Sequence, residues 1–214
     1  MAETAVTLAH QFDDAEQQHD ASTLGMWVFL VTEIMFFSGM FTAYVIYRSL
    51  YADAFAQASR HLDVLLGTIN TSVLITSSLT MALAVRAAQL GRHRVLTTLL
   101  LLTMALGSTF LVIKGVEYGH KFHEGLVPGP GFRSTAADAG QQQLFFSIYF
   151  AMTGLHALHM VIGIGLLGVL VLQARRHRFG SAYYTPVELI GLYWHFVDIV
   201  WIFLFPLLYL FGRR

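Results

Sequence analysis

Five ionisable residues lie inside stretches of this chain that are otherwise apolar enough to cross a lipid bilayer. They are Glu33, His156, His159, His195 and Asp198. An ionisable side chain near the bilayer centre costs roughly 2.5–3.5 kcal/mol to insert, so each one requires a partner and marks a candidate functional site. We call these five residues the intramembrane polar set.

The spacing of these residues indicates which contacts are possible. His195 and Asp198 are three residues apart, as are His156 and His159, so each pair shares one helical face. A hydrogen bond between His195 and Asp198, or from either of them to a histidine of the other pair, would satisfy both groups. For Glu33 two interpretations stay open: a protonated acid that donates one hydrogen bond across the bundle, or a carboxylate that handles protons.

Metal chemistry is the alternative use of such residues. The chain has no cysteine, which excludes thiolate centres and leaves histidine as its only strong transition-metal ligand. Two of the three histidines, placed on facing helices, could hold a haem. Since the polar set can also satisfy itself, we predict a buried polar network, no catalytic residue, no metal site and no cofactor bound by this chain.

The elements that position the set are membrane-spanning helices. The chain has 214 residues, of which 56% are hydrophobic and only 12% charged, far fewer charges than the roughly 25% of soluble domains. A helix needs about 20 apolar residues to cross the hydrocarbon. We therefore predict an all-α polytopic protein, with an acidic N-terminal tail at 1–23 and one transmembrane domain at 24–214. Its five predicted spans are residues 24–47, 62–85, 95–116, 144–172 and 187–211.

Charged residues also mark the helix ends. Lys114 and Glu117 are three apart and are predicted to pair near the membrane surface, and Glu188 lies at the start of the last span. Arg175 and Arg176, which follow the fourth span, are candidates for contact with lipid headgroups. Basic residues are concentrated in the two short loops on the side of the N-terminus, which favours a cytoplasmic N-terminus.

Several separated motifs carry a family resemblance. They are residues 31–39 (VTEIMFFSG), 70–74 (NTSVL), 117–118 (EY), 153–159 (TGLHALH), and Glu188 with 193–201 (YWHFVDIVW). In this order they make the chain similar to subunit III of the haem-copper terminal oxidases, above all to cytochrome c oxidase subunit III. The family form has seven helices, and this chain matches the last five. The two absent helices form one wall of a lipid-filled cleft, which a neighbouring chain could supply.

The resemblance implies both residue roles and a function. Glu33 falls on the buried carbodiimide-reactive glutamate of the family, the rest of the polar set on its buried polar positions, and Glu117 and Glu188 on its carboxylates nearer the helix ends. It implies a non-redox accessory subunit of a proton-pumping oxidase that reduces O₂ to water. Such a subunit packs on catalytic subunit I beside copper-containing subunit II, binds phospholipid, and supports proton uptake and stability during turnover. We expect it in the cytoplasmic membrane of a bacterium.

Other functions remain open. Subunit III of a quinol oxidase, or the similar subunit associated with nitric oxide reductases, belongs to the same class. A small haem-binding cytochrome and a proton-coupled transporter using Glu33 are different classes; five spans without an inverted repeat argue against the transporter. The absence of a basic block argues against nucleic acid as a partner.

Overall fold

The computed structural model describes residues 10–133, 138–181 and 183–211. Its elements are α1 (Ala15–Leu50), α2 (Ala52–Ser59), α3 (Val64–Gln89), α4 (His93–His123), α5 (Ala139–Arg175), α6 (Thr185–Phe205) and the π-helical turn η1 (Pro206–Leu210). The described part holds no β-strand, only a single bridge between Gly180 and Tyr183. Five helices, with η1 continuing α6, are long and apolar enough to span a membrane, which confirms the predicted all-α polytopic class.

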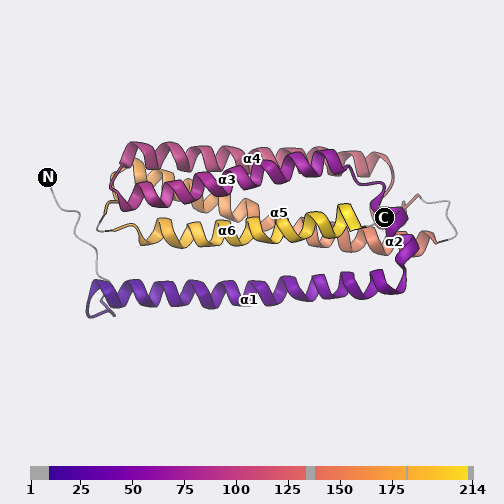
Figure 1. The fold of residues 1–214 in the computed structure, drawn as a ribbon, viewed down its shortest axis with the longest axis horizontal. Helices are drawn as coiled ribbons and strands as arrows, with labels where there is room; N and C mark the ends of the chain where they lie inside the picture. The colour runs from indigo at the N-terminus through magenta and orange to yellow at the C-terminus, as the bar shows by residue number, and fades with distance from the viewer. Residues whose placement is uncertain (1–9, 134–137, 182, 212–214) are drawn as a thin grey trace.

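The five membrane-spanning helices run side by side and alternate in direction (Figure 1). The α3–α4 and α5–α6 connections lie at the same end of the bundle as the start of α1. The rings of His93 and His177, beside those two connections, are 5.1 Å apart. The two short basic loops therefore share one end of the bundle, and the short helix α2 lies at the opposite end.

Helix α1 lies at the edge of the bundle (Figure 1), and only a narrow stripe of its side chains is buried. Its buried residues are Leu30, Phe37 and Tyr44, each seven residues after the last. A seven-residue repeat keeps one side of a helix against its neighbour. Most other apolar side chains of α1 are exposed, including Met35 at 68%, so this helix presents a broad face to lipid or to another protein.

A tryptophan of α6 joins that helix to α3, α4 and α5. Trp194 of α6 is fully buried, and its indole N–H donates to the Ser77 hydroxyl of α3 at 3.2 Å. Its ring fills a notch made by glycines of α4 and α5: a Cβ built on Gly107 would lie 2.6 Å from the ring, and one on Gly163 would lie 3.0 Å from it. Small residues permit this close approach of helices in membranes.

The helices extend beyond the apolar spans. Residues 15–23, which the sequence predicts as part of the tail, belong to α1, because Asp14 caps the helix by accepting from the backbone N–H of Gln17 at 2.7 Å. Residues 1–9 of that tail lie outside the described residues. Helix α4 continues to His123, two turns past the predicted end at residue 116. Hydropathy reports the hydrocarbon-facing part of a helix, whereas caps determine where it begins and ends.

Candidate functional site

Glu33 and His159 form a pair between α1 and α5. The Nε2 atom of His159 lies 3.1 Å from Oε2 of Glu33, and the side chains are 11% and 20% exposed. The other ring nitrogen, Nδ1, lies 2.9 Å from the Leu155 carbonyl oxygen. A carbonyl only accepts, so Nδ1 carries a hydrogen. One further proton then lies between Nε2 and Glu33, and the pair is electrically neutral whether that proton is on the acid or on the imidazole.

Aromatic rings hold this pair in place. The ring centroid of Phe37 lies 5.2 Å from that of His159, edge on, and Tyr193 stacks on the imidazole at 6.4 Å. The Tyr193 hydroxyl donates to the backbone carbonyl of His159 at 3.0 Å. A neutral hydrogen-bonded pair between packed rings is a stable way to keep a titratable carboxyl within the membrane.

The other members of the polar set occupy separate places. His156 is buried between the rings of Phe110 and Trp201, at 5.4 Å and 5.2 Å, and within the described residues neither of its ring nitrogens has a hydrogen-bond partner. His195 of α6 bonds through Nδ1 to the Ser78 hydroxyl of α3 at 2.7 Å.

The bond between His195 and Asp198 that their spacing permits is not formed. Asp198 is 3% exposed, and neither carboxylate oxygen has a hydrogen-bond partner in the described part of the chain. Glu33 and His159 thus form the one direct pair of the set, and the Ser78 hydroxyl stands beside both His195 and Asp198.

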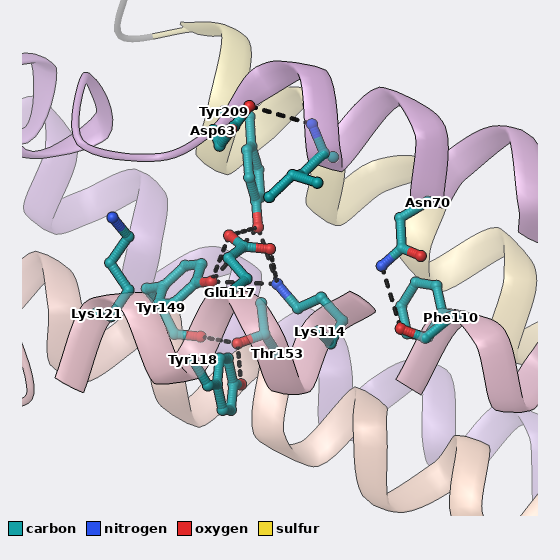
Figure 2. Close-up of polar contacts among 12 residues, drawn as sticks. Asp63, Asn70, Phe110, Lys114, Glu117, Tyr118, Lys121, Tyr149, Thr153 and Tyr209 are labelled. Carbon is teal, nitrogen blue, oxygen red and sulfur yellow. Dashed lines mark hydrogen bonds and ion pairs between the residues drawn. The ribbon is translucent and has the colours of Figure 1, made fainter. Parts of the chain in front are cut away.

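A second buried cluster joins α4, α5 and η1 (Figure 2). Nζ of Lys114 lies 3.0 Å from Oε2 of Glu117, which confirms the predicted i, i+3 pair. The pair is buried inside the bundle, at 4% and 2% side-chain exposure; its place near the membrane surface stays a prediction. Helix α4 runs to His123, so both residues lie within it.

Two tyrosines complete this cluster, which we call the Lys114–Glu117 cluster. The hydroxyls of Tyr149 and Tyr209 donate to Oε1 of Glu117, at 2.8 Å and 2.5 Å. The same hydroxyls accept from Lys114 Nζ at 3.1 Å and 2.9 Å. Lys114 also lies 5.1 Å from the ring centroid of Trp201, a distance at which a cation is attracted to the ring. Every charge in the cluster therefore has partners, as a buried ion pair requires.

Sequence reasoning missed Tyr149 and Tyr209. The available signal was their position, because each lies in an apolar span where a hydroxyl must find a partner. It also missed Lys121, whose Nζ lies 2.7 Å from Glu124 and donates to the His61 carbonyl oxygen at 2.6 Å. These contacts tie the end of α4 to the segment before α3.

The remaining predicted residues lie at helix ends. Glu188 is half-buried in the first turn of α6, where a negative charge is favourable. Arg175 ends α5 and Arg176 follows it, both exposed. Among the described residues, no group of three or more His, Cys, Asp or Glu side chains is arranged to hold a metal ion. That the chain binds no haem or copper stays a prediction.

The fold and the site define a polytopic membrane protein whose buried ionisable groups pair with one another between helices. The family model described as cytochrome c oxidase subunit III matches residues 5–213. The chain therefore belongs to the cytochrome c oxidase subunit III family, as the motifs predict.

Individual relatives agree with this family. The chain is 33% identical to cytochrome c oxidase subunit 3 of Thermostichus vulcanus over 94% of this chain and 92% of that protein. It is 33% identical to cytochrome c oxidase subunit 3 of Corynebacterium diphtheriae over 87% of this chain and 86% of the relative. It is also 29% identical to quinol oxidase subunit 3 of Bacillus subtilis over 95% and 96% of the two proteins. The chain is thus subunit III of a haem-copper terminal oxidase and a partner of other oxidase subunits.

Proposed function

We propose that this chain is the non-redox accessory subunit of a proton-pumping cytochrome c oxidase. In this role it packs on catalytic subunit I beside copper-containing subunit II, in a bacterial cytoplasmic membrane with its own N-terminus on the cytoplasmic side. Haem, copper and O₂ reduction belong to those partners. The Glu33–His159 pair carries the proposal, because it is a proton-holding pair between two membrane-spanning helices.

The pair has the chemistry to support proton uptake. One proton lies between Glu33 and Nε2 of His159, and moving it from one to the other leaves the net charge of the pair at zero. A second proton can enter or leave only by charging the pair, so exchange requires water or a partner group at the exposed side of Glu33. Its side chain is 20% exposed, while that of His159 is 11% exposed. We assign proton exchange to Glu33 and orientation of the carboxyl to His159.

A groove between α1 and α6 suits a phospholipid acyl chain. It encloses about 620 Å³ and is lined almost entirely by apolar side chains, among them Trp27, Ile34, Phe41 and Phe203. Hydrocarbon fits such a groove because it needs no hydrogen-bond partner. The exposed guanidinium groups of Arg175 and Arg176, at the end of the bundle where α1 begins, are suited to phosphate headgroups. We therefore include phospholipid binding in the proposed function.

The experiment compares the assembled oxidase carrying Glu33→Gln with the wild-type complex. The amide keeps the size of the side chain but cannot deliver a proton. We expect the initial rate of O₂ reduction to be nearly unchanged, while proton uptake slows or the number of turnovers before inactivation falls. Glu124→Gln is the matched control, because Glu124 is a carboxylate outside the membrane interior with 48% side-chain exposure. Equal proton uptake and lifetime in all three complexes would leave Glu33 with a structural role only.

Quinol is the alternative electron donor, favoured by the likeness to the Bacillus subtilis quinol oxidase subunit 3. The purified complex distinguishes the two donors directly. Oxidation of reduced cytochrome c, with no activity toward a soluble quinol, supports the proposal; the reverse pattern assigns the chain to a quinol oxidase.

A further inference from the structure

A polar pocket lies between the start of α3 and the end of α4, at the end of the bundle that carries α2. It has a volume of about 480 Å³. One wall is the segment 60–66, and the other consists of four residues of α4: Glu117, His120, Lys121 and Glu124. We call this pocket the α4 vestibule.

The wall on α4 leads from the end of the helix to a buried carboxylate. Its four residues are at positions i, i+3, i+4 and i+7, which share one helical face. The side chain of Glu124, which follows the last residue of α4, is 48% exposed, whereas that of Glu117 is 2% exposed. Seven residues of helix span about 10 Å. The vestibule therefore reaches inward to the Lys114–Glu117 cluster, beside which Asp63 and Lys121 lie (Figure 2).

The charges of the vestibule indicate what fills it. Lys121 is paired with Glu124, and Glu117 with Lys114, which leaves Arg60 and Asp63 with opposite charges. Such a lining selects neither an anion nor a cation, and its polar groups do not suit an acyl chain. Water donates to carboxylates and accepts from cationic groups. Since a water molecule takes up roughly 30 Å³ in the liquid, the vestibule has room for several.

We propose that the α4 vestibule is hydrated and lets the Lys114–Glu117 cluster exchange protons with the aqueous phase at the α2 end of the bundle. Lys114, Glu117, Tyr149 and Tyr209 are joined by hydrogen bonds of 2.5–3.1 Å. A proton that arrives from water on a Glu117 oxygen is balanced by one that returns to water from a tyrosine hydroxyl or from Lys114, so the net charge of the cluster stays at zero. This site is separate from the Glu33–His159 pair and does not depend on the role proposed for that pair.

The test measures proton exchange at Lys114 in the full chain, reconstituted in lipid bilayers. The sequence contains two lysines, Lys114 and Lys121, so lysine isotope-labelled at Nζ gives two amine signals in magic-angle-spinning NMR. The variant Lys121→Arg keeps the charge and leaves the Lys114 signal alone, which assigns both. We expect the Lys114 amine of the wild-type chain to receive magnetisation from water through proton exchange. No such transfer to Lys114 would overturn the proposal.

Blocking substitutions identify the route. His120→Trp places a larger ring in the polar stripe, and His123→Trp is the matched control, because His123 is an exposed residue at the end of α4 outside the vestibule lining. We expect exchange at Lys114 to slow by an order of magnitude in His120→Trp and to stay unchanged in His123→Trp. Leu66→Trp narrows the vestibule from the α3 side and should have the same effect as His120→Trp.

Each failure has its own meaning. Unchanged exchange in His120→Trp and Leu66→Trp would overturn the vestibule as the route, and so would an equal loss in His123→Trp. Should one blocking variant fail to fold, the other variant and the wild-type measurement still decide the question. The subunit assignment and the role of Glu33 stand or fall by the assembled-oxidase experiment above, whatever the result at Lys114.

Discussion

Replacing Glu117 by glutamine should destabilise the helix bundle more than any other single removal of a charge. Lys114 would then remain 3% exposed and without its countercharge, with the two tyrosine hydroxyls and the Trp201 ring as its remaining partners. Breaking a buried ion pair by removing one partner costs about 3–5 kcal/mol, because the remaining charge is left uncompensated. We expect a loss of unfolding free energy in that range for Glu117→Gln.

The partner substitution should cost less. In Lys114→Met, Glu117 keeps both tyrosine donors, and we expect a loss of about 2–3 kcal/mol, the range for losing hydrogen bonds to a charged group. The double variant removes both charges and should lose only about 1–2 kcal/mol, since a buried pair can often be replaced by neutral groups at little cost. The two substitutions are therefore expected to be non-additive by at least about 3 kcal/mol.

The assay is a double-mutant cycle on the purified chain in detergent micelles, unfolded by titration with sodium dodecyl sulfate and followed by tryptophan fluorescence. Trp194 and Trp201 lie in the helix that packs against the cluster and report its loss. A loss below about 1 kcal/mol for Glu117→Gln, or additive effects in the double variant, would refute the account of the cluster as a mutually compensated pair.

Three further predictions concern other parts of the molecule. Gly107→Leu should lower the free energy of unfolding by about 1–3 kcal/mol in the same titration, because its Cβ would lie 2.6 Å from the Trp194 ring. Gly165→Leu is the control, since a Cβ at Gly165 meets open space. An equal loss in both variants would contradict the close fit of the Trp194 ring against Gly107. His159→Phe should shorten the working life of the complex as Glu33→Gln does, since it removes the only hydrogen bond of Glu33 to a side chain among the described residues; a normal lifetime would separate His159 from the role of Glu33. The double variant Arg175→Gln, Arg176→Gln should reduce the anionic phospholipid retained per complex in native mass spectrometry. Arg60→Gln, at the other end of the bundle, should not. Equal lipid in both variants would show that Arg175 and Arg176 do not bind the headgroups.

The sequence was sufficient for the membrane-spanning helices and for local pairs. Lys114 and Glu117 are three residues apart on one helix, so their contact depends only on helical geometry. Five apolar runs predicted five spans, because the thickness of the bilayer sets the length of each. The start of α1 was harder to predict from the sequence, because the capping contact of Asp14 precedes the apolar run by about nine residues.

Contacts between helices were beyond sequence reasoning. His156 and His159 share a helix, yet His159 meets Glu33 of α1 while His156 packs between Phe110 and Trp201. Depth along the membrane could be counted from the sequence, but the rotation of each helix toward its neighbours could not. For the same reason the roles of Tyr149 and Tyr209 were not predictable, since nothing local indicates that both point at one carboxylate of α4.

The central claim, that this chain is a supporting subunit and not a redox protein, is tested most directly by purification through a tag on the chain itself. In mild detergent we expect it to bring down a haem- and copper-bearing partner in equal amount, and after separation from that partner the chain should show no Soret absorption and no bound copper. Stoichiometric haem or copper on the isolated chain would contradict the account.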